Sequence, residues 1–420
     1  MKNPTISIIG LGYVGLPLSV VFSQKYRVTG YDNNNDRVNQ LNNFIDKTNE
    51  IESKEIEKCL NENLIITSDL KLIKYADIYI ITVPTPIDNN KNPDLTILKN
   101  ATKMVGGLIK KQNIIIFEST VFPGCTEEVC VPILEQESKL KYNVDFYCGY
   151  SPERVNPGDR EHTIDKIVKV TSGSDKSTSE IIDKLYSSAI SAGTYMAPSI
   201  KVAEAAKVIE NTQRDINIAF INELARIFSK MNIDTNEVLD AASTKWNFLN
   251  FRPGLVGGHC IGVDPYYLAN KAKEIGYHPE IILAGRNVND DMGIFVSNQI
   301  IELVKNSSEK VNSALILGAT FKENCPDYRN TKVLDIFNTL SNNNINPDIY
   351  DPWINKKTFK EEFNISIHNE LPRKKYNIII LAVAHECFKN MDLNKLKSKT
   401  FNIVYDLKGF LNKNNVTKRL

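Results

Sequence analysis

Cys260 lies in a loop whose composition suits covalent chemistry. It follows Gly257, Gly258 and His259 in a segment, 252–265, that is dense in glycine and proline, so the backbone can approach a ligand closely. A thiolate there could attack a carbonyl carbon if a neighbouring cation or base favoured the ionised form. Packing as a small buried hydrophobe is the commoner role of a cysteine. The adjoining glycines and the nearby carboxylate of Asp264 favour the nucleophile.

A metal site is not expected in this loop. His259 stands beside Cys260, but no paired cysteine motif accompanies them, and Cys125 and Cys130 have no other ligand nearby in the sequence. His259 therefore either contacts a substrate or merely fills the loop. The sequence leaves both roles open.

Three polar residues share one face of a long predicted helix. Lys207, Asn211 and Arg214 are spaced at i, i+4 and i+7 in the segment 200–231, which contains neither glycine nor proline. A solvated polar stripe is the plain alternative to a catalytic face. Because the helix is otherwise apolar, we expect it to be largely buried, and the three side chains then become candidates for chemistry.

A glycine pattern near the N-terminus predicts a dinucleotide site. Gly10, Gly12 and Gly15 follow an apolar strand and precede a helix, which is the arrangement that lets a pyrophosphate rest on the helix N-terminus. Asp32 closes the next strand at the offset expected for an acidic residue that binds the adenosine ribose. Its carboxylate favours NAD over NADP, although Arg37 is near enough to accommodate a 2′-phosphate.

The elements that position these residues alternate between strand and helix in two stretches of the chain. This alternation predicts doubly wound parallel sheets on both sides of the helix 200–231, and hence an α/β fold with two Rossmann-like domains joined by a long central helix. The predicted domain boundaries are 1–197, 198–308 and 309–420. The strands of the first domain are Ile6–Gly10, Arg27–Asp32, Ile78–Pro84, Asn113–Thr120 and Phe146–Glu153. The second has strands Ala314–Phe321, Asp348–Asp351, Tyr376–Ala384 and Ile403–Asp406, with a helix at Lys332–Ser341.

Composition excludes several classes of partner. The chain has 420 residues, with 51 Lys plus Arg against 50 Asp plus Glu and a net charge of +1. Its overall charge is therefore too small to attract nucleic acid or a membrane. Its 7 cysteines are scattered and odd in number, which argues against a disulfide framework. No signal peptide and no apolar stretch of about 20 residues is present, so a cytoplasmic protein is expected.

Seven blocks, which cover essentially the whole chain in order, resemble the nucleotide-sugar 6-dehydrogenases, the family that includes UDP-glucose dehydrogenase. The blocks are Gly10-Leu11-Gly12-Tyr13-Val14-Gly15, Val83-Pro84-Thr85-Pro86, Glu118-Ser119-Thr120-Val121, Ser151-Pro152-Glu153-Arg154-Val155, Lys207 to Asn211, Gly257-Gly258-His259-Cys260, and Phe321-Lys322 followed by Asp327-Tyr328-Arg329.

The loop after Cys260 resembles one branch of this family. UDP-glucose enzymes carry a lysine before the aspartate of the loop, whereas Val263 precedes Asp264 here. This version, with Leu255-Val256 and Tyr266-Tyr267, looks closest to enzymes acting on UDP-GlcNAc or UDP-GalNAc, and UDP-ManNAc enzymes are the nearest competitors. The resemblance thus implies a UDP-N-acetylhexosamine substrate and a uronic acid product for surface polysaccharide synthesis.

The resemblance also implies a four-electron oxidation with NAD. Cys260 attacks the C6 aldehyde formed in the first oxidation, and the thiohemiacetal becomes a thioester that water hydrolyses. Lys207 and Asn211 stabilise the oxyanion, and Asp264 moves protons with Thr120 through a bound water. Glu153 is the base for hydrolysis, or else it is a structural partner of Arg154.

The remaining implied roles concern binding. The C-terminal domain would hold UDP, with Lys322 neutralising phosphate charge. A homodimer built on the central helical region is also expected, because the family's loop arginine can come from a neighbouring subunit. The implied cofactor residues are Gly10, Gly12, Tyr13, Val14, Gly15, Asp32, Arg37, Thr85, Thr120 and Arg329. The implied substrate residues are Glu153, Arg154, Val155, Lys207, Asn211, Arg214, Phe251, Arg252, Gly258, His259 and Lys322.

Two other functions share parts of this pattern. A two-electron dehydrogenase of the hydroxyacid type has the same glycine fingerprint but needs no thiol. A catalytically silent nucleotide-binding protein would have no chemical need to keep Cys260, Lys207, Asn211 and Asp264 together.

Overall fold

The chain forms two compact units in the computed structural model, which describes residues 3–88, 90–155, 161, 163–259, 261–399 and 401–420. Unit 1 comprises Met1–Glu210 and Tyr266–Tyr277, and unit 2 comprises Asn211–Pro265 and His278–Leu420. Cys260 is outside the described residues, so its predicted role is not examined against the structure.

Unit 1 is built on a parallel sheet with the strand order β3-β2-β1-β4-β5-β6. Ile6 pairs with both Val28 and Ile78, so β1 lies at the centre, where the order of the strands reverses. Every residue of β1, β4 and β5 is buried, as expected for strands covered on both faces. The strands are β1 (Ile6–Ile9), β2 (Val28–Tyr31), β3 (Leu64–Thr67), β4 (Ile78–Ile81), β5 (Ile114–Phe117) and β6 (Tyr147–Tyr150).

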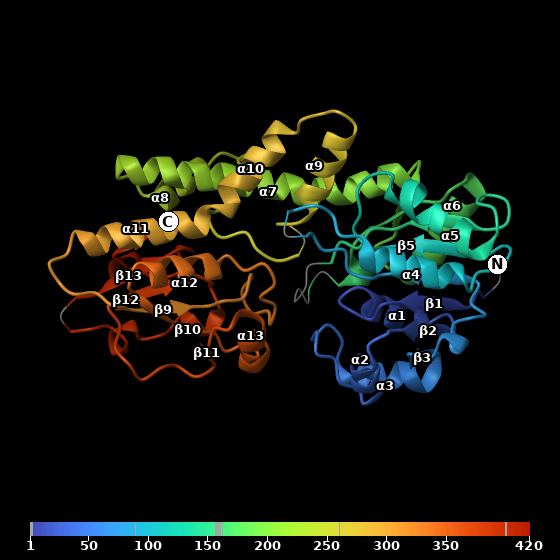
Figure 1. Ribbon diagram of the computed structural model, residues 1–420, viewed down its shortest axis with the longest axis horizontal. Coiled ribbons are helices and arrows are strands. Elements are labelled where there is room, and N and C mark those ends of the chain that lie inside the picture. The colour runs from blue at the N-terminus through green and yellow to red at the C-terminus, as the bar shows by residue number, and fades with distance from the viewer. Residues whose placement is uncertain (1–2, 89, 156–160, 162, 260, 400) are drawn as a thin grey trace. The chain divides into compact units, whose positions relative to one another are not determined.

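Helices flank this sheet, and a two-stranded parallel sheet follows it in the sequence (Figure 1). The side chain of Asn34 caps α2 by accepting hydrogen bonds from the first N–H groups of that helix, and Asp175 caps α6 in the same way. The helices are α1 (Gly15–Ser23), α2 (Asn35–Asn42), α3 (Ser53–Glu62), α4 (Thr96–Gly106), α5 (Val131–Ser138) and α6 (Lys176–Ala189), and the small sheet contains β7 (Lys169–Thr171) and β8 (Thr194–Met196).

The long central helix is confirmed with the predicted ends. Helix α7 runs over Ile200–Met231 without interruption and joins the two units. Its length of 32 residues follows from the absence of glycine and proline. Lys207 and Asn211 lie one turn apart on it.

Unit 2 repeats the same topology, with the strand order β11-β10-β9-β12-β13-β14, all parallel. The predicted fold class is therefore confirmed. The strands are β9 (Ser313–Leu317), β10 (Asn346–Tyr350), β11 (Ile367–His368), β12 (Ile378–Leu381), β13 (Ile403–Asp406) and β14 (Lys418–Arg419). The helices are α8 (Thr235–Ala242), α9 (Asp264–Glu274), α10 (Glu280–Asp290), α11 (Met292–Lys305), α12 (Val333–Asn342) and α13 (Lys356–Phe363). Most of α9 belongs to unit 1.

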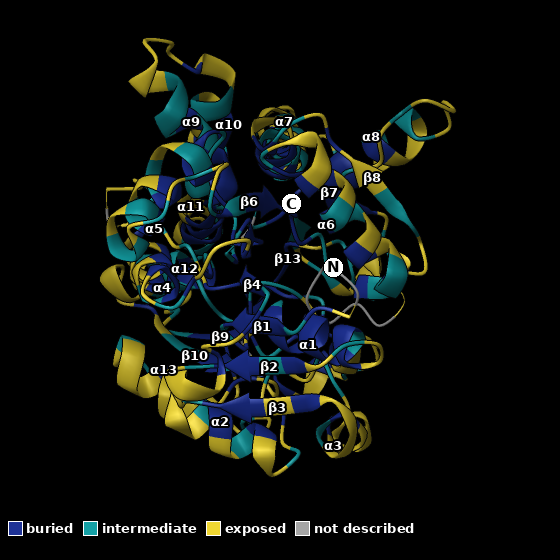
Figure 2. Cartoon of the chain, turned by 90° about the vertical axis from the view of Figure 1, so that its right-hand side faces the viewer, coloured by how far each residue is buried: buried dark blue, intermediate teal, exposed yellow. Residues whose placement is uncertain are grey.

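Burial follows this layering, with buried strands and helices whose outer faces are exposed (Figure 2). Several predicted strands are too long. β5 ends at Phe117 rather than at Thr120, β12 ends at Leu381 rather than at Ala384, and β9 ends at Leu317 rather than at Phe321. Gly318 has a φ of +92°, and a Cβ there would lie 2.4 Å from Cβ of Val383. The chain therefore turns at Gly318, and residues 319–321 belong to the loop that follows.

Candidate active site

The turn after β1 has the geometry that a dinucleotide pyrophosphate requires. Gly10 has a φ of +94°, which side chains rarely adopt. A Cβ on Gly15 would lie 1.8 Å from the carbonyl oxygen of Gly10, so only glycine lets α1 approach β1 this closely. A Cβ on Gly12 would meet no atom within 4 Å, which leaves space for a ligand against the backbone. With Tyr13 and Val14 completing the turn, these residues fit NAD.

Asp32 and Arg37 both bind the backbone of this turn. The N–H of Leu11 donates to Asp32 Oδ2 at 2.9 Å, and Arg37 Nε donates to the carbonyl oxygen of Leu11 at 2.9 Å. Arg37 Nη2 also lies 2.9 Å from Asp46 Oδ1. Burial would raise the pKa of Asp46, but hydrogen bonds from Thr48 and the Arg37 charge hold it below its ordinary value. Arg37 thus has a carboxylate partner within the chain, which favours NAD over NADP.

The segments after β4 and β5 are tied together at the carboxyl edge of the sheet. Thr85 Oγ1 donates to the carbonyl oxygen of Thr120 at 2.7 Å. The hydroxyl of Tyr267, a fully buried residue, donates to the carbonyl oxygens of Thr85 and Pro86 at 3.0 and 3.1 Å. This edge, where the order of strands reverses between β1 and β4, is the usual ligand side of such a sheet.

Glu153 lies at the same edge, three residues after β6, and it is 7% exposed. Its Oε2 lies 2.6 Å from the ammonium of Lys169, which also lies 2.8 Å from Glu118 Oε2. Burial raises the pKa of Glu118, and the nearby Glu153 charge adds to this, in opposition to Lys169. The structural partner of Glu153 is therefore Lys169, and the alternative of a salt bridge to Arg154 is wrong.

Arg154 has a different side-chain partner. Its Nε and Nη2 lie 3.0 and 2.8 Å from the two carboxylate oxygens of Glu210, which is on α7. The backbone N–H groups of Arg154 and Val155 instead donate to Glu153 Oε1 at 2.6 and 2.7 Å. The three consecutive residues thus form a turn around the Glu153 carboxylate.

Lys207 is a buried cation on α7. It is 8% exposed, and within the described part of the chain no hydrogen bond or ion pair reaches its ammonium. A buried charge without a partner costs free energy, so this position suits a negatively charged group of a ligand or intermediate.

One turn further along α7, Asn211 meets the predicted proton carrier. Asn211 Nδ2 donates to Asp264 Oδ2 at 2.5 Å, and Asp264, the first residue of α9, is 1% exposed. The structure thus brings two predicted catalytic residues together across 53 positions of sequence. Arg214, the third residue of the predicted stripe, is exposed.

The two glycines before His259 let the loop pack closely against the segment after β9. A Cβ on Gly258, whose φ is +78°, would lie 2.8 Å from the ring of Phe321, and one on Gly257 would lie 2.9 Å from the carbonyl oxygen of Asn330. The N–H of Gly258 donates to the carbonyl oxygen of Arg329 at 3.0 Å, and Asn330 Nδ2 donates to that of Gly258 at 3.1 Å.

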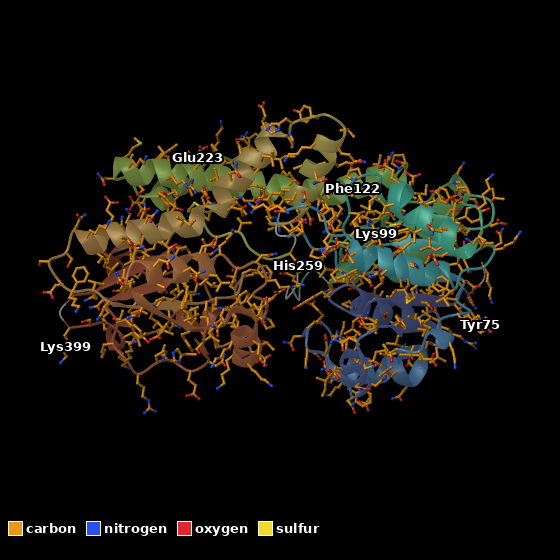
Figure 3. The ribbon with its side chains drawn as sticks, viewed as in Figure 1. Tyr75, Lys99, Phe122, Glu223, His259 and Lys399 are labelled. Carbon is orange, nitrogen blue, oxygen red and sulfur yellow. The ribbon has the colours of Figure 1, made fainter. Side chains whose placement is uncertain are left out.

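His259 and Arg329 both approach Asp327. His259, which is labelled in Figure 3, has its Nδ1 3.8 Å from Asp327 Oδ2. Its ring packs edge-on to Phe321. Arg329 Nη2 lies 2.5 Å from the same oxygen. Burial would raise the pKa of Asp327, but the hydrogen bonds and charge of Arg329 outweigh burial and lower it. Asp327 is thus ionised, and it lies beside His259 and Arg329, which were predicted to bind the substrate and the cofactor.

The start of the loop is fixed to α7 and α8. Asn222, fully buried on α7, exchanges two hydrogen bonds with the backbone of Gly254, at 2.9 and 3.0 Å. Arg252 Nη2 lies 2.6 Å from Asp240 Oδ1 on α8, while its side chain remains 36% exposed. Phe251, beside it, is half-buried.

A pocket opens at the carboxyl edge of the second sheet, where its strand order reverses between β9 and β12. Two lysines that the sequence analysis missed line it, Lys332 at the start of α12 and Lys408 after β13. Thr320 also lines it, and its hydroxyl donates to the carbonyl oxygen of Lys322 at 2.7 Å. Crevices at this position bind ligands in doubly wound folds, and the lysines suit an anion.

For some of the functional residues that the sequence analysis missed, their position just after a predicted strand could have identified them. Lys408 follows a buried strand by two residues, which is the site that a parallel sheet uses for ligands. Lys169 has no such signal, because it begins β7 and meets Glu118 and Glu153 only through the packing of the sheet.

Metal ligands do not gather in the described residues, where no cluster of three or more His, Cys, Asp or Glu side chains could hold an ion. Among the cysteines that the structure describes, none forms a disulfide with another. Of the helices that the structure describes, none combines the length and the apolar character needed to cross a membrane.

Comparison with known proteins identifies the family. Residues 4–190 match the NAD binding domain of the UDP-glucose/GDP-mannose dehydrogenase family, residues 201–291 its central domain, and residues 315–413 its UDP binding domain. The chain is 52% identical over 424 residues to UDP-N-acetyl-D-glucosamine 6-dehydrogenase of Pseudomonas aeruginosa, with 100% of each chain covered. It is 49% identical over 423 residues to Protein CapL of Staphylococcus aureus, with 100% of this chain and 99% of CapL covered.

A solved structure shares the whole fold. The UDP-D-ManNAc dehydrogenase from Pyrococcus horikoshii superposes with a TM-score of 0.89 at 27% identity, covering 99% of this chain and 98% of that one. Together with the matched domains, this confirms the predicted resemblance and the predicted cofactor. The chain belongs to the UDP-glucose/GDP-mannose dehydrogenase family, and it is an NAD-dependent dehydrogenase of nucleotide sugars.

Proposed function

We propose that this protein oxidises the C6 hydroxyl of UDP-N-acetylglucosamine to a carboxylate through a thioester on Cys260. The observation that carries the proposal is the arrangement on α7, where Lys207, buried and without a partner among the described residues, lies one turn from Asn211, which pairs with Asp264. This places a cation, an amide and a carboxylate where an oxyanion and a proton have to be handled.

The chain's own residues have distinct tasks in this reaction. Lys207 favours the Cys260 thiolate and, with Asn211, stabilises the oxyanion that forms when the thiolate adds to the C6 aldehyde. Asp264 moves the proton with Thr120 through a bound water. The second oxidation leaves a thioester on Cys260, and Glu153 accepts a proton from the water that hydrolyses it. When bound, NAD supplies the hydride acceptor for both oxidations.

NAD would be held at the carboxyl edge of the first sheet. The Gly10, Gly12 and Gly15 turn, with Tyr13 and Val14, receives the pyrophosphate, and Asp32 binds the adenosine ribose beside Arg37. Thr85, Thr120 and Arg329 complete the proposed cofactor residues.

The UDP-sugar would be held by unit 2 together with residues of the loops and helix already described. Lys332 and Lys408, which line the pocket at the second sheet, supply positive charge for the diphosphate together with Lys322. The other proposed contacts are Phe251, Arg252, Gly258, His259, Arg154, Val155, Arg214 and the catalytic residues Glu153, Lys207 and Asn211.

We propose three functional segments with the predicted boundaries 1–197, 198–308 and 309–420. The first would bind NAD, the second would carry the Cys260 loop and the subunit contact, and the third would bind UDP. The three matched domains of the family support this division. A homodimer, a cytoplasmic location and use of the product in surface polysaccharide synthesis stay predictions from the sequence.

The identity of the sugar rests on similarity of the whole chain. In sequence comparison, identity is 52% to the UDP-N-acetyl-D-glucosamine enzyme but 30% to the UDP-N-acetyl-D-mannosamine dehydrogenase of Pyrococcus horikoshii, although the fold is shared with the latter. The absence of a lysine before Asp264 also separates the chain from UDP-glucose enzymes, so the N-acetylated substrate is favoured.

One assay series tests the proposal. NADH release is measured with UDP-GlcNAc, UDP-GalNAc, UDP-ManNAc and UDP-glucose, and UDP-GlcNAc is expected to react fastest with two NADH per sugar. One NADH per sugar would support a two-electron dehydrogenase instead. Cys260→Ser should bind NAD and the sugar nucleotide but form no uronate, and wild-type turnover in that variant would refute the thioester route.

A further inference from the structure

A buried set of polar groups in unit 1 has no role in the proposed reaction except for its one member Glu153. The ammonium of Lys169, on β7, lies 2.6 Å from Glu153 Oε2 and 2.8 Å from Glu118 Oε2, and these side chains are at most 8% exposed. The hydroxyl of Tyr186, on α6, donates to the other oxygen of Glu118. We call Glu118, Lys169, Glu153 and Tyr186 the Lys169 cluster.

Stability alone does not account for this cluster. A buried ion pair is often no more stable than apolar side chains of the same volume, because both charges lose their hydration. The cluster also holds two carboxylates against one ammonium. A protein that needed only a packed interior at this place could fill it with apolar residues, so the charges point to a task at Glu153.

The Glu153 carboxylate is held in one orientation from three directions. Its Oε1 accepts the N–H groups of Arg154 and Val155 at 2.6 and 2.7 Å, and its Oε2 accepts from Lys169 at 2.6 Å. A carboxylate offers about four acceptor positions, so about one remains for a water molecule. A base that has a single open position can hold a hydrolytic water in a single place.

Lys169 lies between two buried carboxylates. Two buried carboxylates that share a cation cannot ionise independently, because each disfavours the charge of the other. Burial, together with the Glu153 charge, raises the pKa of Glu118. Burial would lower the pKa of Lys169, but the two carboxylates outweigh it and raise it. The ammonium therefore persists beside Glu153.

We propose that Lys169, held by Glu118 and Tyr186, is the positioning residue that holds the Glu153 carboxylate in place for hydrolysis of the thioester. In this step the water oxygen bonds to the thioester carbonyl carbon and Glu153 takes a proton from the water. The C–S bond breaks with its electron pair going to the Cys260 sulfur, which regains a proton. Nothing is oxidised or reduced. The inference rests on the thioester route proposed above.

The test separates hydrolysis from the steps before it. In Lys169→Met, prepared in the full chain, we expect the first turnover to release NADH at the wild-type rate and amplitude. Steady-state turnover should then fall about tenfold to a hundredfold, since a mispositioned base loses part of the effect of general base catalysis. Intact-protein mass spectrometry should detect the sugar acyl group retained on Cys260.

Hydroxylamine supplies a readout that a merely structural role would not change. It attacks the thioester without needing Glu153, giving a hydroxamate and the free Cys260 thiol, so it should restore turnover in Lys169→Met. Glu153→Gln should show the same accumulation and the same rescue. Lys184→Met, a matched change at an exposed lysine of α6, should behave as wild type.

The outcomes distinguish this inference from the proposed function. Accumulation in Glu153→Gln but not in Lys169→Met would overturn the inference alone. Absence of accumulation in Glu153→Gln would refute the role of Glu153 as the base, and the inference with it. If Lys169→Met does not fold, Glu118→Gln combined with Lys169→Met keeps the wild-type net charge of the cluster. That double variant should accumulate the thioester, and wild-type turnover in it would overturn the inference.

Discussion

Lys207 differs from the other lysines of α7 in being buried without a partner among the described residues. Replacing it by Met keeps the length of the side chain but removes the charge that the proposed oxyanion needs. Removal of one such donor typically lowers kcat by about 100-fold to 1,000-fold. We therefore expect Lys207→Met to lose kcat on this scale while the Kd for NAD, measured by calorimetry, stays unchanged.

The matched control for this change is Lys230→Met, at an exposed lysine near the end of the same helix. It should leave kcat unaltered. The loss of a buried charge without a partner should also leave the thermal stability of Lys207→Met equal to or above that of wild type. A variant that retains wild-type kcat would remove Lys207 from the mechanism.

At the residue scale, spacing along the chain predicts only part of the site. Lys207 and Asn211 are one helical turn apart, so their shared face is visible in the sequence. Asp264 contacts Asn211 across 53 positions, and its role was predicted from the family resemblance. Lys169 was missed altogether, because its contacts with Glu118 and Glu153 arise when separate strands pack side by side.

The turn between β1 and α1 uses its glycines for two different physical reasons. At Gly15 a Cβ would lie 1.8 Å from a backbone oxygen, whereas at Gly12 it would enter open space. Gly15→Ala should therefore lower the unfolding temperature by several degrees. Gly12→Ala should keep that temperature but weaken NAD binding about tenfold or more, because the methyl group occupies the space where the pyrophosphate approaches.

Differential scanning fluorimetry and calorimetric titration with NAD measure these two effects separately. Gly107→Ala, at the end of α4, is the control, since a Cβ there would be 3.5 Å from its nearest neighbour. It should change neither quantity. If Gly12→Ala bound NAD as tightly as wild type, the assignment of this turn to the cofactor would be wrong.

The side-chain amide of Asn222 on α7 holds the start of the loop that carries Cys260. Asn222→Ala removes both hydrogen bonds to Gly254 and leaves a buried N–H without an acceptor, a loss of about 1–3 kcal/mol in the free energy of unfolding. The KM for the UDP-sugar should rise with the displaced loop, while the Kd for NAD stays constant. Urea denaturation and steady-state kinetics check these effects, with Asn217→Ala on the same helix as the control.

At the element scale, long periodic segments were predictable and short edge strands were not. The ends of α7 follow from a run without glycine or proline, and the buried strands follow from their β-branched residues. β11 and β14 have only 2 residues each, too few to show a period. The end of β9 at Leu317 follows from Gly318, whose steric requirement comes from Val383 on another segment.

At the scale of the whole molecule, part of α7 presents an apolar face to solvent within unit 2. Phe220, Ile227 and Met231 are 55%, 45% and 57% exposed, and their spacing of i, i+7 and i+11 places them on one side of the helix. Exposed apolar residues in a row are typical of a surface that pairs with another protein. They support the predicted homodimer on the central helical region.

Phe220→Glu tests this dimer, because a second copy would have to bury the new carboxylate within the apolar face without a partner. Size-exclusion chromatography with light scattering should show a dimer for wild type and a monomer for the variant, while Lys184→Glu, at an exposed lysine of α6, remains dimeric. The monomer also tests the loop arginine. Arg252 contacts Asp240 of its own chain, so a monomer that keeps the wild-type KM for the UDP-sugar would assign Arg252 to its own site. A raised KM would mean that the site takes this arginine from the neighbouring subunit. If the wild-type protein itself were a monomer, the predicted dimer would be wrong.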